Sequence, residues 1–413
     1  MANYKRTKLS CYFSYLSMAS IFSLPPLLFN TFHENYGVSY TLLGTLVAVN
    51  FCTQLTIDLI FTFFTKYFNI KKTVTVMPLI TSAGMLIYAL IPWLFPQYAY
   101  IGLVIGTVIF SVSAGLSEVL LSPVVAAIPS ETPDKDMSLL HSLYAYGVLM
   151  VVIVSTAFLK IFGTENWMYL TLFWAFLPVI AFIMFSSSPM PEVNITNPPD
   201  GKNAGKKNLI MTLCVLCIFF GSAAENSMTN WISSYMEIAL TIPKVIGDIL
   251  GMAAFAVALG LTRTWYSKKG KNIYKVLFLG MAGAVVCYIT AGLSPFPALS
   301  LVACIMTGMC TAMLWPGSLI LMEEKLPHVG VAAYALMAAG GDFGASIAPQ
   351  LLGLVVDKVK DSSIILPLSE ALSISTEQLG MKAGMLAASI FPVIGVIVLI
   401  VIKKALGDKK ALN

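Results

Sequence analysis

Long apolar runs separated by short charged segments dominate the chain. Residues 73–117 and 276–322 contain no charged side chain over 45 and 47 positions, respectively. Because a helix crosses a bilayer with about 20 apolar residues, each run is long enough for two crossings. A pair of prolines near the middle of each run indicates a turn. Each run therefore predicts a helical hairpin within a membrane.

The same pattern continues along the whole chain and predicts twelve membrane-spanning helices. A polar connection rich in Pro, Asn, Gly and Lys separates the first six spans from the last six. We therefore expect an all-α integral membrane protein with a six-helix bundle at 1–187, a cytoplasmic linker at 188–207 and a second six-helix bundle at 208–413. The expected spans are residues 10–31, 41–64, 73–93, 98–122, 138–160, 166–186, 208–233, 245–265, 273–292, 298–322, 330–356 and 383–402.

Faint internal similarity links the two halves. Pro129 and Pro327 are 198 residues apart, and Gly147 and Gly344 are 197 residues apart, in segments of similar layout. This spacing indicates a duplicated six-helix unit and predicts two pseudo-symmetric bundles. Repeated halves are typical of secondary transporters, whose solute site lies near the middle of the bilayer.

The composition excludes most soluble classes of protein. Hydrophobic residues make up 58% of the 413 residues and charged residues only 11%, whereas soluble domains carry about 25% charged residues. Soluble enzymes and nucleic-acid-binding proteins are therefore excluded, and common hydrolase, metalloprotease and phosphate-loop motifs are absent from the sequence. The seven cysteines lie in apolar stretches, where we expect helix packing and neither a metal site nor a cofactor.

Lys and Arg are distributed unequally between alternate connections. Twenty lie on the side of the two termini and five on the other side. Because connections rich in positive charge stay in the cytoplasm, we expect a plasma-membrane protein with both termini cytoplasmic. The apolar segment after Lys5, Arg6 and Lys8 is interpreted as a retained first span and not as a signal peptide.

Glu118 is the deepest charged residue of the first half. Ser111, Glu118 and Ser122 follow i, i+7, i+11 spacing and share one helix face. A charge at bilayer depth is costly and usually functional, so Glu118 is a candidate for binding a proton during transport. The alternative is a protonated acid that only bonds a neighbouring helix.

Span 2 carries a second polar stripe. Asn50, Gln54 and Asp58 follow i, i+4, i+8 spacing. Lipid offers no hydrogen bonds, so this stripe is expected to face protein or water. Asp58 is a candidate proton-coupling or gating residue, with an interdomain or loop-anchoring role as the alternative. Gln54 is a candidate solute contact.

Span 7 presents the most polar face of the second half. Its carboxylate, carboxamide and hydroxyl groups lie beside an indole, a combination suited to a polyhydroxylated ligand. Trp231 is accordingly a candidate solute contact, or alternatively an anchor at the membrane interface. The residues of this face are Ser222, Glu225, Asn226, Thr229 and Ser233.

Further candidates lie in spans 5, 10 and 11. Trp315-Pro316-Gly317 predicts a local helix break near a solute, with packing against a proline kink as the alternative. Asp342 lies among glycines that permit close helix approach and is a candidate gate. His141 can titrate near neutral pH and is a further gating candidate, unless it is a packing residue.

The loop after span 2 carries a family resemblance. Its sequence KYFNIKK, residues 66–72, resembles a degraded form of the acidic, glycine and basic loop motif of the major facilitator superfamily. The resemblance implies a gating role for Lys71 and Lys72, whereas Lys66 and Asn69 stand where an acid and a glycine are usual. It covers essentially the whole chain and implies the two-bundle transporter fold of that superfamily.

A narrower resemblance comes from spans 4 and 5. GLSEVLLSP at 115–123 and LLHSLYAYG at 139–147 are similar to segments of the fucose permease-like sugar:proton symporters. This implies that Glu118 corresponds to a carboxylate used there in sugar binding or proton coupling, and that Asn226 corresponds to a cavity position. Tyr144 is a further candidate solute contact. Those symporters carry an acid in span 1, where this chain has none.

These observations favour a secondary transporter that imports a small polar solute, with a sugar as the leading candidate, by alternating access coupled to protons. No ATP-binding domain is recognisable, so transport must use a gradient. The expected partners are the solute, protons and the lipid bilayer, without nucleic acid, and the expected state is a monomer. The alternatives are an uncoupled sugar facilitator, a proton-coupled exporter of drugs or metabolites, a membrane sensor and a membrane enzyme. Span 5 lacks the glycine-proline motif typical of such exporters.

Overall fold

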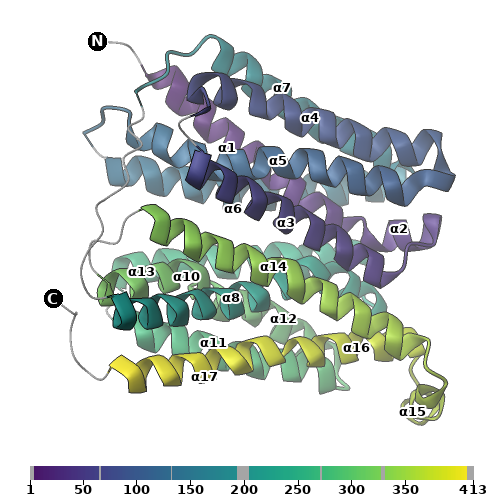
Figure 1. The fold of residues 1–413 in the computed structure, drawn as a ribbon. Coiled ribbons are helices and arrows are strands. Elements are labelled where there is room, and N and C mark those ends of the chain that lie inside the picture. Colours follow the sequence, from purple (N-terminus) through teal and green to yellow (C-terminus); the bar gives the residue numbers. More distant parts are fainter. Residues whose placement is uncertain are drawn as a thin grey trace. The chain divides into compact units, whose positions relative to one another are not determined.

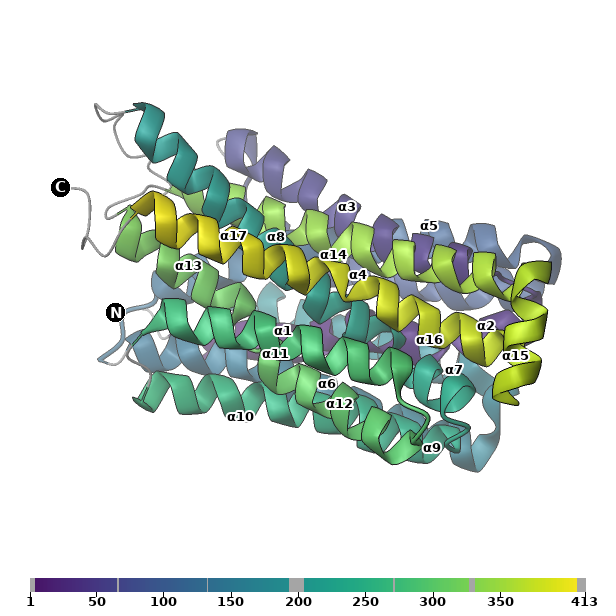
Figure 2. The same cartoon turned by 90° about the horizontal axis from the view of Figure 1, so that it is seen from below.

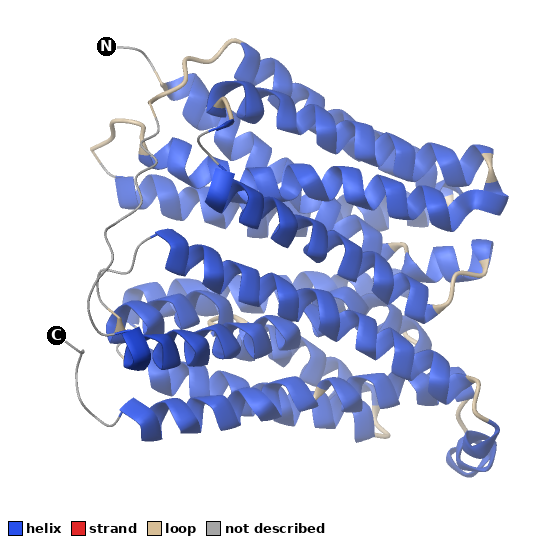
Figure 3. Ribbon diagram, in the orientation of Figure 1, coloured by secondary structure: helices blue, strands red, loops and turns tan. Residues whose placement is uncertain are grey.

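The computed structural model is entirely helical in the part of the chain that it describes (Figure 3). The described residues are 4–64, 67–131, 133–192, 204–269, 272–326 and 331–406. Most of the predicted linker at 188–207 lies outside these ranges. The chain divides into two compact units, of which one contains residues 1–38 and 49–196 and the other residues 39–48 and 197–413.

In the described residues of the first unit the chain forms seven helices, which are coloured purple to teal in Figure 1. Single-turn 3-10 helices at Pro96–Tyr98 and Thr164–Asn166 form two of the connections. The helices are α1 (Lys5–Leu27), α2 (Phe29–Tyr36), α3 (Tyr40–Phe64), α4 (Ile70–Leu94), α5 (Ala99–Ala126), α6 (Pro133–Phe162) and α7 (Trp167–Ser186). The first turns of α3 belong to the second unit, so this helix contributes to both.

The second unit contains the remaining helices and two short π-helical segments, Tyr235–Ala239 and Asp248–Ala253. Helix α15 forms part of the connection between α14 and α16 (Figure 1). The helices are α8 (Ala204–Ser234), α9 (Lys244–Gly247), α10 (Ala254–Lys269), α11 (Ile273–Leu293), α12 (Pro297–Thr311), α13 (Leu314–Lys325), α14 (Val331–Lys360), α15 (Leu366–Leu372), α16 (Thr376–Ala388) and α17 (Ile390–Leu406).

Each predicted span coincides with one helix or with helices separated by a short break. Among the described residues, nine helices are long and apolar enough to cross a membrane, or ten if the bent pair α1–α2 counts as one span. That pair bends by 47° just after Pro25 and Pro26, because proline removes a backbone donor and interrupts the helix. Helices α6 and α14, of 30 residues each, occupy the two other predicted spans.

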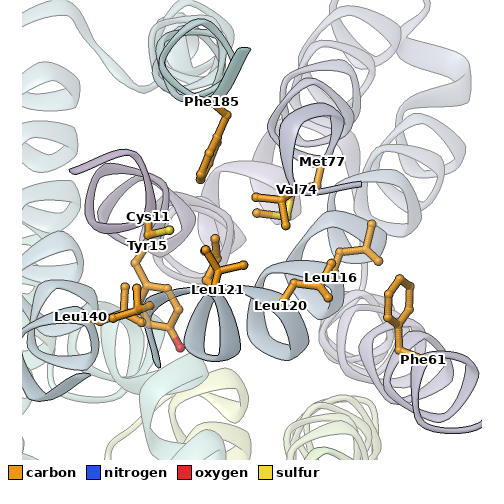
Figure 4. Packing of buried hydrophobic residues seen from close by; sticks show 12 residues of the cluster. Cys11, Tyr15, Phe61, Val74, Met77, Leu116, Leu120, Leu121, Leu140 and Phe185 are labelled. Carbon is orange, nitrogen blue, oxygen red and sulfur yellow. The ribbon is translucent and has the colours of Figure 1, made fainter. Parts of the chain in front are cut away.

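Apolar side chains and close helix contacts hold the first unit together. Helix α4 packs along α5 and α7, and α1 packs along α6 and α7 (Figure 1). A buried cluster joins α1, α3, α4, α5, α6 and α7, and most of its side chains are labelled in Figure 4. Cys11 lies in this cluster with no exposed surface, consistent with the predicted packing role of the cysteines. The described cysteines are free thiols.

The second unit is built on α8, which packs against α13, α14 and α17, while α11 packs against α12, α16 and α17 (Figure 2). The start of α3 joins this unit through hydrogen bonds. The backbone N–H groups of Tyr40 and Thr41 donate to the Asp357 carboxylate over 3.2 and 2.6 Å. Asp357, near the end of α14, therefore caps the start of α3.

Equivalent contacts recur in the two units. A Cβ atom on Gly147 of α6 would lie 2.6 Å from the Leu16 carbonyl oxygen of α1, and one on Gly344 of α14 would lie 2.2 Å from the Phe219 carbonyl oxygen of α8. The two glycines that the sequence pairs by their spacing thus serve the same purpose, which is close packing of the fifth span on the first. This agreement supports the predicted duplication.

Candidate functional site

Asp58 of α3 and Glu118 of α5 lie together in the first unit. A carboxylate oxygen of one is within 4.8 Å of a carboxylate oxygen of the other, and Asp58 is 4% exposed. Gly115, one turn before Glu118, permits this approach, because a Cβ there would lie 3.2 Å from the Gln54 Cα. Two carboxyl groups within this distance influence each other's affinity for protons. The two predicted proton-coupling residues are therefore neighbours.

The remaining polar groups of the α3 stripe face the interior of the first unit. Asn50 and Gln54 are buried, and the Gln54 amide donates to the Asn50 Oδ1 over 3.1 Å. The Ser111 hydroxyl of α5 lies 2.6 Å from the same oxygen. The stripe therefore avoids lipid, as its spacing predicts. The side chain of Ser122, the third residue on the Glu118 face, lies outside the described residues.

The other candidates of the first unit lie on α4 and α6. Tyr144 is half-buried and packs edge-on against Phe22, with ring centroids 5.8 Å apart. Lys71 and Lys72 are exposed in the first turn of α4, where the Lys72 N–H donates to Asn69 Oδ1. His141 lies in α6, but its side chain is outside the described residues.

A polar network in the second unit joins α8, α10 and the α12–α13 break. Arg263 Nη2 lies 3.5 Å from Glu225 Oε1, and the Arg263 Nε–H donates to the Ala312 carbonyl over 2.8 Å. Asn226 donates to the carbonyl and hydroxyl oxygens of Ser222 over 3.1 and 3.2 Å. Carboxylate, guanidinium and carboxamide groups thus gather on one side of α8.

Arg263 is the residue of this network that sequence reasoning missed. The count of positive charges assigns Arg263 to the connection after span 8, although the span predicted at 245–265 includes it. The structure places Arg263 in α10, three residues before the end of the apolar helix Lys244–Tyr266. The rarity of arginine in the sequence could have drawn attention to this residue. The chain contains 25 Lys and Arg residues, and only two of them are arginines, Arg6 and Arg263.

The helix break in span 10 lies before Trp315, which corrects the predicted position. Helix α12 ends at Thr311 and α13 begins at Leu314. Pro316 has no N–H to donate to the carbonyl four residues earlier, and that carbonyl belongs to Ala312, which Arg263 satisfies. Trp315 itself is half-buried and packs on Gly341, where a Cβ would lie 2.3 Å from the indole ring.

Trp231 is a packing residue in this structure and not an interface anchor. It is completely buried, and its indole N–H donates to the Pro349 carbonyl over 3.0 Å. A tryptophan of the interfacial belt would instead have its ring at the membrane surface. Ser233 of the same α8 face is also engaged, because its hydroxyl donates to Asp248.

Asp342 is a buried residue of α14, with 3% of its surface exposed. Gln350, two turns further along the same face, donates to the Thr45 hydroxyl over 2.8 Å. The face that carries Asp342 is therefore directed into protein, which is compatible with the predicted gate.

Comparisons with known proteins agree on the class of fold. The family model described as Major Facilitator Superfamily matches residues 11–349. No curated protein sequence matches the chain.

The chain also resembles solved transporter structures over nearly its whole length. A bacterial homologue of the human lysosomal transporter Spinster has a TM-score of 0.77 at 12% identity, covering 97% of this chain and 96% of that chain. A D-xylose-proton symporter has a TM-score of 0.72 at 14% identity, covering 94% and 97%. A nucleoside transporter has a TM-score of 0.70 at 14% identity, covering 96% and 99%. At such identities the likeness shows the fold alone.

Proposed function

The chain belongs to the Major Facilitator Superfamily of membrane transporters, and on that premise we propose that it carries a small polar solute, a sugar first of all, by alternating access with proton symport. Membership of this family makes it a multi-pass membrane transporter. The assignment to the fucose permease-like branch stays a prediction, as do the plasma membrane, the cytoplasmic termini and the domain limits at 187 and 208.

Proton coupling rests on one observation, the closeness of Asp58 and Glu118. An acid inside a membrane helix normally faces a cavity or a partner and takes part in transport. When such helices shift, an acid can take up or release a proton, because the proton affinity of a carboxyl group depends on its charged neighbours. Asp342, His141, Lys71 and Lys72 remain gating candidates.

A hydroxylated solute suits the polar groups of the α8 face. Glu225 and Asn226 offer a carboxylate and an amide there. Gln54 stays a candidate contact in the first unit, although its amide is buried and donates to Asn50. Such groups can both donate to and accept from solute hydroxyls. Trp231 is a weaker candidate for a solute contact than its residue type suggests, because its indole N–H already donates to the Pro349 carbonyl.

The test is solute-triggered charge movement in proteoliposomes on a solid-supported membrane. Monosaccharides and polyols are screened with wild type, Glu118→Gln and Asp58→Asn. We expect an inward current with at least one solute, increased by an inward proton gradient and abolished in both variants, because neither amide can accept the coupled proton. Glu165→Gln is the matched control, since it removes an exposed carboxylate of the same unit and should leave the current unchanged.

Other outcomes would contradict the proposal in different ways. Exchange of a sugar by wild type without current, at any proton gradient, would indicate an uncoupled facilitator. No response across the panel, combined with proton-driven efflux of amphiphilic compounds, would indicate an exporter. Normal current in both acid variants would remove the coupling role from this pair.

A further inference from the structure

The Glu225–Arg263 pair is an ion pair placed within two membrane-spanning helices of one unit. Arg263 Nη2 and Glu225 Oε1 are 3.5 Å apart, and the side chains are 39% and 19% exposed, respectively. The guanidinium is thus the more exposed partner of the pair. Burying a charged pair is costly even near the end of an apolar helix, where Arg263 lies three residues before Tyr266, so the retention of the pair calls for a physical explanation.

The Arg263 guanidinium and the Glu225 carboxylate have further polar groups besides those that contact each other. A guanidinium has five N–H donors, and the described residues engage two of those of Arg263, one at Ala312 and one at Glu225. Within the same described part of the chain, Glu225 Oε2 accepts no hydrogen bond. The Arg263 guanidinium is therefore able to donate to a further polar group such as a solute hydroxyl, whereas Glu225 Oε2 is buried and acts through its charge.

Arginine suits this position because one side chain makes two polar contacts. The Nε–H holds the Ala312 carbonyl, which has lost its own helical donor at Pro316, while the outer nitrogens face Glu225. A lysine ammonium is a point charge on a flexible stem and cannot hold this fixed fork. The backbone break at α12–α13 thus sets the position of the positive charge relative to Glu225.

The charges of the pair sum to zero, and the neighbouring Asn226 is neutral. An anionic solute that reaches Arg263 meets Glu225, and a cationic solute that reaches Glu225 meets Arg263, so each suffers like-charge repulsion. A neutral hydroxylated solute suffers neither. We propose that the Glu225–Arg263 pair is the charge-selectivity element of the solute site, which admits neutral polyhydroxylated solutes and rejects organic anions and cations. This inference rests on the proposed sugar transport.

The experiment measures charge selectivity as a ratio of uptake rates in proteoliposomes. The probes are glucose, galactose and mannose, each with its uronate and its 2-amino-2-deoxy derivative. We expect wild type to prefer a neutral sugar. Glu225→Gln leaves the positive charge of Arg263 unbalanced. It should raise the ratio of uronate uptake to neutral-sugar uptake about 10-fold or more. Arg263→Gln should raise the amino-sugar-to-neutral ratio by a similar factor.

Two further variants separate selectivity from folding. The double variant Glu225→Gln/Arg263→Gln carries no charge at the pair and should lose discrimination against both charged classes. Glu237→Gln removes the same kind of charge from the ion pair with Lys244, elsewhere in this unit, and should keep the wild-type ratios. Because each ratio is measured on one preparation, it does not depend on how much folded protein a variant yields.

The failure of this inference can be told from failure of the proposed function. Uptake of a neutral sugar with ratios unchanged in both single variants would overturn the selectivity role and leave sugar transport standing. A wild type that prefers a charged derivative would overturn it as well. A wild type that carries none of the nine probes, while a different class of solute is transported, would remove the proposed function together with this inference.

Discussion

Single residues in this protein take their roles from partners that lie far away in the chain. Trp231 has the residue type of a sugar-binding platform, yet its indole bonds the Pro349 carbonyl and packs near the Tyr40 ring. Glu225 likewise pairs with Arg263, a residue 38 positions later in the chain. The residue type determines which polar groups a side chain carries, and its tertiary contacts determine which partners those groups bind.

Trp231→Phe tests the packing role. The change removes one hydrogen bond donor and part of a buried ring, so we expect a loss of about 1–3 kcal/mol in stability, with the same ranking of transported sugars as wild type. Thermal unfolding in detergent and uptake competition measure the two properties. A variant of wild-type stability with an altered sugar ranking would instead make Trp231 a solute contact.

At the scale of helices, glycines and prolines determine how closely the spans approach and where they break. Gly344 lets α14 lie against the Phe219 carbonyl of α8. Pro316 interrupts span 10, but the interruption lies three to four residues earlier, because the bond that proline cannot make ends at the Ala312 carbonyl. The sequence predicts the cause of this break more accurately than its position.

Gly344→Ala should be far more harmful than Gly260→Ala. A Cβ at Gly344 would meet backbone, which cannot move aside as a side chain can, whereas a Cβ at Gly260 meets nothing within 4 Å. We expect a loss of about 1–3 kcal/mol for the first change and a change within about 1 kcal/mol for the second. Gly147→Ala should resemble Gly344→Ala. Melting temperatures in detergent provide the comparison, and equal values for Gly344→Ala and Gly260→Ala would contradict it.

At the scale of the whole molecule, the distribution of positive charge is the strongest signal. Moving Arg263 from a connection into α10 leaves the asymmetry between the two sets of connections intact. The asymmetry is a property of the entire chain, so the orientation that it predicts does not depend on any one residue.

Reporter fusions test this orientation. We expect a fluorescent protein fused at the C-terminus to be bright and alkaline phosphatase at the same point to be inactive, because both termini are predicted to be cytoplasmic. The opposite result is expected for fusions after α15, in the connection that carries fewer positive charges. An active phosphatase at the C-terminus would contradict the predicted topology.

The candidate site could be predicted only in part. Helical spacing placed Asn50, Gln54 and Asp58 on one face, and the structure directs that face into protein. No local pattern could show that Glu118 lies beside Asp58, because this contact depends on how closely α5 approaches α3 at Gly115. Spacing along one helix describes a face, whereas a contact between helices depends on packing.

The sequence by itself determined the helical class, the positions of the spans and the superfamily, because a bilayer selects long apolar segments and each helix satisfies its own backbone hydrogen bonds. Only the tertiary structure decided which polar residues meet. It brought Glu118 to Asp58 and Arg263 to Glu225 and a proline-freed carbonyl. Such pairs depend on distances between helices, and those distances are set by side-chain volumes that act across the packed interfaces.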